Sequence, residues 1–71
     1  MKAHDVGIIW DGTNEGWYLR YSTDEQNALD SSMHMPDDAH LSDGELYAAA
    51  LTEACYCGIE LPTIEDISIE R

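Results

Sequence analysis

Two stretches near the start of the chain alternate apolar and polar residues. Residues 6–10 and 17–22 place a large apolar side chain at every second position, a period of two that is typical of β-strands. Residues 11–16, between them, are rich in glycine, aspartate and asparagine, which favour turns. The pattern predicts a β-hairpin in which Trp10 and Trp17 flank the loop and pack across it.

A helical pattern runs from Ser42 to Gly58. Ser42 and Glu45 have the spacing of a capping box, and Gly58 lies where a left-handed C-terminal cap is expected. The side chains expected to face the core are Leu46, Ala50, Ala54 and Cys57, with Tyr47 and Leu51 beside them. Those expected on the solvent side are Glu45, Ala49, Thr52, Glu53 and Tyr56.

The other segments are shorter. Residues 24–33 begin after a second possible capping box and are open to interpretation as a short helix, although their polar residues argue against one. Residues 64–70 read as a strand, with Ile67, Ile69 and Glu65 on the core side and Asp66, Ser68 and Glu70 facing out. We therefore expect a single α+β domain over residues 1–71: a small antiparallel sheet of about three strands, the hairpin plus a C-terminal strand, with the main helix on one face.

Charge adds the strongest functional signal. Fifteen acidic residues face only three basic ones, Lys2, Arg20 and Arg71, for a formal net charge of -12. No lysine or arginine lies between Arg20 and Arg71, whereas most of the acids do. Direct binding to nucleic acid is disfavoured, because phosphates would be repelled. A basic protein surface is the complementary partner.

The acids that we expect to bind such a partner fall into groups. One group, at the entry to the main helix, is expected to be exposed and free of nearby basic residues: Asp37, Asp38, Asp43 and Glu45. A second lies on the outer face of the last strand: Asp66 and Glu70. The remaining candidates follow the hairpin: Asp24, Glu25 and Asp30.

Catalytic and metal-binding motifs are not found. The three histidines and the two cysteines, Cys55 and Cys57, match no zinc-binding spacing, and the acids match no calcium loop. Two cysteines two apart on a helix point in different directions, so we expect no disulfide between them and a reduced, cytoplasmic setting. No secretory signal or membrane-spanning run is recognised. We expect a non-enzyme without cofactor or metal, and the oligomeric state stays open.

In its size, its acid block and its lack of a catalytic motif, the chain resembles phage-encoded nucleic-acid mimics that inhibit bacterial defence systems, among them anti-CRISPR and anti-restriction proteins. That resemblance implies an inhibitor that occupies a DNA-binding groove of its partner. The alternative starts from Asp11-Gly12 through Gly16-Trp17-Tyr18, followed later by residues 46–54. This order is similar to the hairpin-then-helix pattern of HicB-like antitoxin domains, which implies a regulatory module that binds a partner protein through its hairpin.

Overall fold

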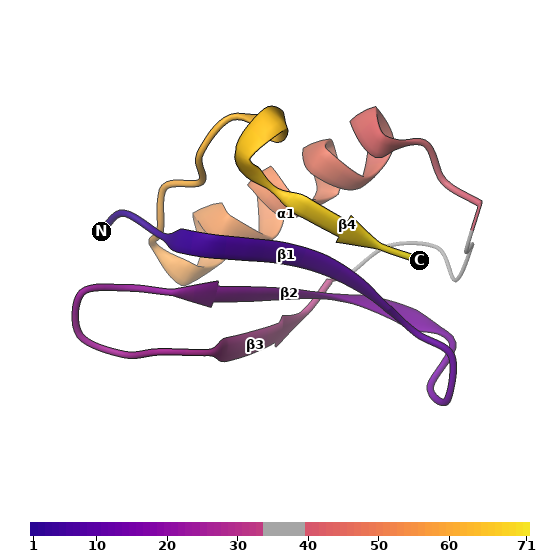
Figure 1. Cartoon of the computed structure of the whole chain (residues 1–71), viewed down its shortest axis with the longest axis horizontal. Coiled ribbons are helices and arrows are strands. Elements are labelled where there is room, and N and C mark those ends of the chain that lie inside the picture. Colours follow the sequence, from indigo (N-terminus) through magenta and orange to yellow (C-terminus); the bar gives the residue numbers. More distant parts are fainter. Residues whose placement is uncertain (34–39) are drawn as a thin grey trace.

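The computed structural model describes residues 1–33 and 40–71 and has an α+β fold, in which one helix packs on a four-stranded sheet (Figure 1). The elements, in chain order, are β1 (His4–Asp11), β2 (Gly16–Ser22), β3 (Leu29–Ser32), α1 (Asp43–Cys57), the 3-10 turn η1 (Ile64–Asp66) and β4 (Ser68–Glu70). The strands lie side by side in the order β3-β2-β1-β4. The expected α+β class, with one helix on a small sheet, is confirmed.

The predicted hairpin is present as β1 and β2, which pair antiparallel. Trp10 and Trp17 are direct cross-strand partners, and their ring centroids lie 5.3 Å apart in an edge-to-face arrangement. The Asp11 carboxylate organises the turn, since it accepts hydrogen bonds from the backbone amides of Thr13 and Asn14. The hairpin therefore forms as its pattern predicts.

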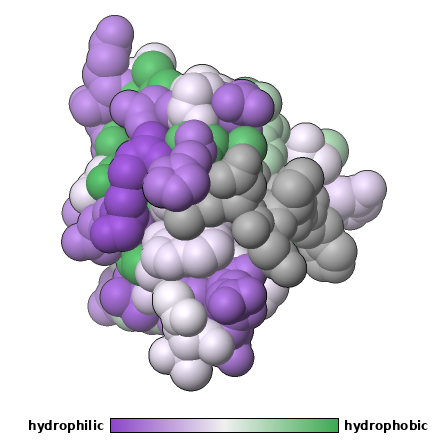
Figure 2. Space-filling view, turned by 90° about the vertical axis from the view of Figure 1, so that its right-hand side faces the viewer, coloured by the Kyte–Doolittle hydropathy of each residue, from purple (hydrophilic) through white to green (hydrophobic). Residues whose placement is uncertain are grey.

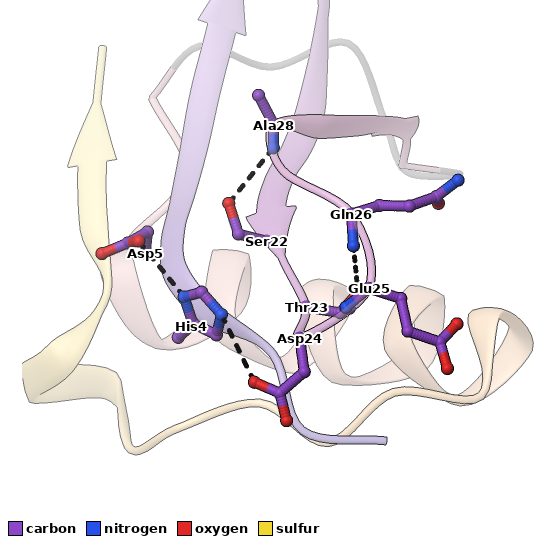
Figure 3. A network of polar contacts seen from close by, with 8 residues as sticks. All are labelled: His4, Asp5, Ser22, Thr23, Asp24, Glu25, Gln26 and Ala28. Carbon is purple, nitrogen blue, oxygen red and sulfur yellow. Dashed lines mark hydrogen bonds and ion pairs between the residues drawn. The ribbon is translucent and has the colours of Figure 1, made fainter.

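The short helix that the sequence left open over residues 24–33 does not form, so that prediction is wrong. These residues form a loop and then β3, which pairs antiparallel with β2 (Figure 3). The hydroxyls that resemble a helix cap instead bind the loop: Ser22 Oγ accepts the amide of Ala28, and Thr23 Oγ accepts the amides of Glu25 and Gln26. Ala28 adopts a left-handed φ of 54°, which turns the chain back toward β2.

The C-terminal segment also differs from its prediction. Residues 64–66 form η1 rather than the start of a strand, so β4 contains only residues 68–70. β4 pairs parallel with β1, which makes the sheet mixed and not purely antiparallel. The parallel direction follows from the connection, because α1 carries the chain back to the end of the sheet at which β1 begins.

The ends of α1 match the sequence closely. Ser42 and Glu45 form both bonds of the capping box, and Gly58 adopts the left-handed conformation with a φ of 70°. Asp43 and Glu45 place negative charge in the first turn, where the helix dipole favours it. These local signals fix where the helix begins and ends.

The core lies between α1 and one face of the sheet. It is formed by the apolar side chains Ala3, Val6, Ile8, Trp17, Leu19, Tyr21, Met33, Leu46, Ala50 and Ile67. The predicted core positions Leu46, Ala50 and Ala54 are buried, but Leu51 and Cys57 are exposed. Glu53, predicted on the solvent side, is buried instead, and Glu65, predicted on the core side, is exposed. Among the described residues, no helix is long and apolar enough to cross a membrane.

Candidate partner-binding surfaces

The carboxylates of Asp43 and Glu45 at the entry to α1 are held by ionic and hydrogen-bond partners, which the sequence did not predict for Asp43. Arg71 reaches across from the end of β4 and pairs with the Asp43 carboxylate, while its other guanidinium nitrogen donates to the carbonyl oxygen of Leu41 at 2.7 Å. Glu45 is held by the capping box with Ser42. The expectation that this group is free of basic residues is therefore wrong for Asp43. Asp37 and Asp38 lie outside the described residues.

The face of the sheet opposite α1 carries two of the candidate acids. The pairing register places Asp30, Arg20, Gly7 and Ser68 in one row across the strands, and Ser32, Tyr18, Ile9 and Glu70 in the next. We call these two rows the open sheet face. In Figure 1 the strands lie in front of α1, so the reader looks onto this face.

Arg20 dominates the electrostatics of the open sheet face. Its Nε donates to Asp30 at 2.9 Å, and its guanidinium carbon lies 5.5 Å from the centroid of the Tyr18 ring. The hydrogen bond from Arg20 holds the pKa of Asp30 below its ordinary value, and the same bond raises the pKa of Arg20. Glu70 is exposed on the same face, two strands away, and its charge also raises the pKa of Arg20.

A third group of acids lies in the loop between β2 and β3. Asp24 and Glu25 are exposed there, close to the start of β1 (Figure 3). His4 lies between two carboxylates, with Nδ1 3.2 Å from Asp5 and Nε2 4.0 Å from Asp24. This end of the sheet therefore places the imidazole of His4 between the carboxylates of Asp5 and Asp24.

The last candidate, Asp66, belongs to η1. Its carboxylate accepts the hydroxyl of Thr63 at 3.2 Å and so holds the turn together. Because Asp66 is not in β4, the predicted row of Asp66, Ser68 and Glu70 along one strand does not form. The described candidate acids thus occupy separate surfaces of the molecule and not one patch.

A polar cluster that the sequence did not indicate lies between α1 and the sheet. Ser31 Oγ donates to the buried Glu53 carboxylate at 2.5 Å, and Cys57 Sγ lies 3.7 Å from both Ser31 Oγ and Glu53 Oε2. Burial raises the pKa of the neighbouring Tyr21 phenol, and contact with Cys57 and the charge of Glu53 raise it further. One feature of the sequence could have indicated that Glu53 is buried. It follows Leu46 and Ala50 at helical spacing, which places the three side chains on one face of α1.

The turn end of the hairpin is hollowed. An open depression of about 690 Å³ is lined by Trp10, Asp11, Gly12, Asn14, Gly16, Trp17, Tyr18, Asp30, Ser32 and Met33. Arg71 lies over the Trp17 ring, 6.0 Å from its centroid. Figure 2 looks at this end of the molecule, where purple hydrophilic and near-white residues cover most of the visible surface outside the grey atoms, with small green hydrophobic areas between them.

In residues 1–33 and 40–71, no group of three or more histidine, cysteine or acidic side chains is arranged to hold a metal ion. Comparison of the chain with protein-family models, curated proteins and solved structures finds no match.

Proposed function

We propose that this chain is a non-enzymatic inhibitor that binds a basic, nucleic-acid-binding surface of a partner protein and so blocks it as a DNA mimic. The class of target that fits is a bacterial defence complex of the CRISPR or restriction type. The observation that carries the proposal is the excess of exposed carboxylates. Both arginines already pair with an acid, Arg20 with Asp30 and Arg71 with Asp43, and the net charge of -12 remains.

The charge density supports the proposal in magnitude. The molecule measures 31 Å along its longest axis, which gives one net negative charge per about 2.6 Å of that length. Duplex DNA carries one negative charge per ~1.7 Å of helix axis. The two densities lie within a factor of two. A groove that attracts phosphates would also attract this chain, and the attraction would speed the encounter.

The spread of the acids over several surfaces fits a summed attraction better than one dominant contact. A partner groove that surrounds much of this small chain would meet Asp24 and Glu25 at one end of the sheet and Glu70 on the open sheet face. Neutralising one carboxylate removes one attraction among many. Neutralising a group removes several, as in protein–DNA binding, where affinity depends on the number of charges paired.

The experiment begins with a partner recovered by affinity capture from a bacterial lysate and identified by mass spectrometry. The affinity of the purified pair is then measured across a salt series, with and without competing duplex DNA. We expect affinity to fall steeply with salt and DNA to compete for the partner. Binding that is insensitive to salt and to DNA contradicts the mimic.

A second candidate is a HicB-like or similar small regulatory module that binds a partner protein through its hairpin. The observation that favours it is the half-buried Tyr18, which lies at the hollow beside the hairpin turn. The matched test compares Tyr18→Ala with the double change Asp24→Asn and Glu25→Gln. If binding is insensitive to salt and is lost in Tyr18→Ala but not in the double variant, the regulatory module is supported. If the double change weakens binding to the partner, the mimic is supported. Trp17 is unsuitable for this test because it belongs to the core.

A further inference from the structure

The depression at the turn end of the hairpin, which we call the turn hollow, combines aromatic rings with carboxylates. Its lining includes the rings of Trp10, Trp17 and Tyr18 and the acids Asp11 and Asp30. Among the described residues that line it there is no lysine, arginine or histidine. Aromatic faces and carboxylates both attract cations, so this lining favours a positively charged ligand over an apolar or an anionic one.

Both arginines of the chain contact a ring of this lining and a carboxylate at the same time. The guanidinium carbon of Arg20 lies 5.5 Å from the centroid of the Tyr18 ring, and its Nε donates to Asp30 at 2.9 Å. The guanidinium carbon of Arg71 lies 6.0 Å from the centroid of the Trp17 ring, and the same group pairs with a carboxylate at the entry to α1. A ring beside a carboxylate is thus the environment in which this protein holds a guanidinium group.

Trp10 and Asp11 provide a further ring and a further carboxylate at the turn hollow. They lie at the end of β1, where the chain enters the turn, and both line the hollow. Trp10 is half-buried and packs edge-to-face with Trp17. The cation–π contacts in the described part of the chain involve Trp17 and Tyr18, so the Trp10 ring stays available to a cation from another molecule.

The Asp11 carboxylate is charged and held in place. Its Oδ1 accepts the backbone amides of Thr13 and Asn14, and its Oδ2 accepts the side-chain amide of Asn14 at 2.8 Å. These hydrogen bonds, chiefly the one from the Asn14 side chain, lower the pKa of Asp11. All three donors are neutral, so they fix the carboxylate without cancelling its charge. Oδ2 accepts one of these bonds and retains a lone pair for another donor.

We propose that the turn hollow binds a guanidinium group, that of an arginine side chain on the basic surface of the partner protein. Asp11 accepts its N–H groups, and Trp10 supplies the aromatic contact. A guanidinium suits the hollow better than an ammonium, because it is planar, stacks on rings and donates along its edge. The volume of about 690 Å³ lies within the ~300–1,000 Å³ of ordinary ligand pockets, so a whole arginine side chain fits. Only the assignment of this arginine to a partner rests on the proposed function.

The first test titrates the full chain with N-acetyl-arginine amide and follows the indole N–H of Trp10 and the backbone amides of residues 11–14 by NMR. The probe is added up to about 50 mM at constant ionic strength, because a contact with one side chain gives a dissociation constant in the millimolar range. We expect saturable shifts of these signals. The lysine analogue has the same charge, and the citrulline analogue has nearly the same shape without the charge. Both should bind at least about threefold more weakly.

General attraction of cations to an acidic chain would give a different result. It would make the arginine and lysine analogues bind equally, and it would move the backbone amides of Asp24 and Glu25, in the loop between β2 and β3, as much as those of the turn. That loop lies at the other end of the sheet from the hairpin turn (Figure 1). Either observation overturns the proposal.

The second test uses variants of the two residues that would bind the probe. Asp11→Asn removes the charge but keeps an oxygen that can accept the turn amides, and Asp24→Asn is the matched control. Trp10→Leu removes the ring and keeps an apolar side chain beside Trp17, and the amide spectrum of each variant shows whether the hairpin is folded. We expect the dissociation constant for the arginine analogue to rise at least about threefold for Asp11→Asn and for Trp10→Leu, and to change little for Asp24→Asn. An affinity that Asp11→Asn leaves unchanged overturns the proposal.

The turn hollow and the proposed function fail separately. The titration needs no partner, so a chain that inhibits nothing can still bind the arginine analogue. A chain that binds its partner with a steep salt dependence but does not bind the analogue is a mimic without an arginine site. In the purified pair, Asp11→Asn should raise the dissociation constant at least about threefold more than Asp24→Asn does. Equal effects of the two changes would show that the arginine does not come from the partner.

Discussion

Ser31 of β3 donates its hydroxyl hydrogen to the buried carboxylate of Glu53 in α1. This bond joins the edge strand of the sheet to the helix across 22 positions of sequence. Glu53 belongs to the same helix face as Leu46 and Ala50, so a carboxylate lies at the border of an apolar core. A buried carboxylate is tolerated only where donors replace the water that it loses. The hydroxyl of Ser31 is one such donor.

Ser31→Ala should therefore destabilise the fold, although serine to alanine is a small change. Removing a hydrogen-bond donor from a buried charged group costs about 1.5–3 kcal/mol. In a domain of this size, each kcal/mol lowers Tm by roughly 4–8 °C. The neighbouring Ser32 is exposed on the open sheet face and gives the matched control. Thermal melts of Ser31→Ala and Ser32→Ala decide the question, and equal melting temperatures would remove the energetic role of the Ser31–Glu53 bond.

The same helix provides a second pair of matched changes. Ala50 is fully buried, whereas Ala48, two residues earlier, is exposed. Ala50→Asp places an unpaired carboxylate in the core at a cost of several kcal/mol, which approaches the whole stability of a small domain. We expect it to unfold the chain, and Ala48→Asp to leave a folded protein when circular dichroism is recorded at low concentration. A folded Ala50→Asp variant would mean that α1 packs through another face.

The features that the sequence predicted well are turns and helix caps, which depend on residues close together in the chain. The Asp11-Gly12 turn, the Ser42–Glu45 capping box and the Gly58 cap each act within a few residues, so their patterns carry their geometry. Glu53 was misplaced because a charged residue suggests a solvent face, and only the packing of β3 against α1 supplies the donor that permits burial.

The misassigned residues 24–33 show the same limit. A serine or threonine followed by acids fits a helix start as well as a tight loop, and the pairing of β3 with β2 decides between them. The candidate acids were identified by charge, and charge alone does not say which of them an arginine neutralises.

The Asp30–Arg20 pair predicts a pH dependence. Arg20 lowers the pKa of Asp30, chiefly by its hydrogen bond. The stabilisation from the pair is therefore fully present above the ordinary pKa of an aspartate and is lost as pH falls through the lowered value. Both side chains are about half exposed, so solvent screens the pair and its contribution to stability is small.

An NMR titration of the carboxyl carbons measures this effect directly. In the wild-type chain the titration midpoint of Asp30 should lie below the ordinary value of an aspartate, about 3.9. In Arg20→Gln the midpoint of Asp30 should rise toward its ordinary value. An Asp30 midpoint that does not move would show that Arg20 does not bind it in solution.

The ion pair of Asp43 with Arg71 changes the expected effect of removing a carboxylate on the stability of the fold. In a chain with a net charge of -12, removing a carboxylate should generally stabilise the fold. Asp43→Asn is the exception, because Asp43 pairs with Arg71 and lies in the first turn of α1. Losing a surface ion pair costs up to about 1 kcal/mol, and losing the favourable charge at a helix N-terminus costs about 0.3–1 kcal/mol.

Asp24→Asn is the matched change, since Asp24 lies at the opposite end of the sheet, across the His4 ring from Asp5, and its ion pair in the described part of the chain is with His4. At pH 8, where an ordinary histidine is neutral, we expect Tm to rise for Asp24→Asn and to fall for Asp43→Asn. Both shifts should shrink between about 20 and about 500 mM salt, because screening weakens repulsion and attraction alike. If both variants gain stability equally, the Arg71–Asp43 contact contributes nothing measurable, and the helix entry is as open to a basic partner as its sequence suggests.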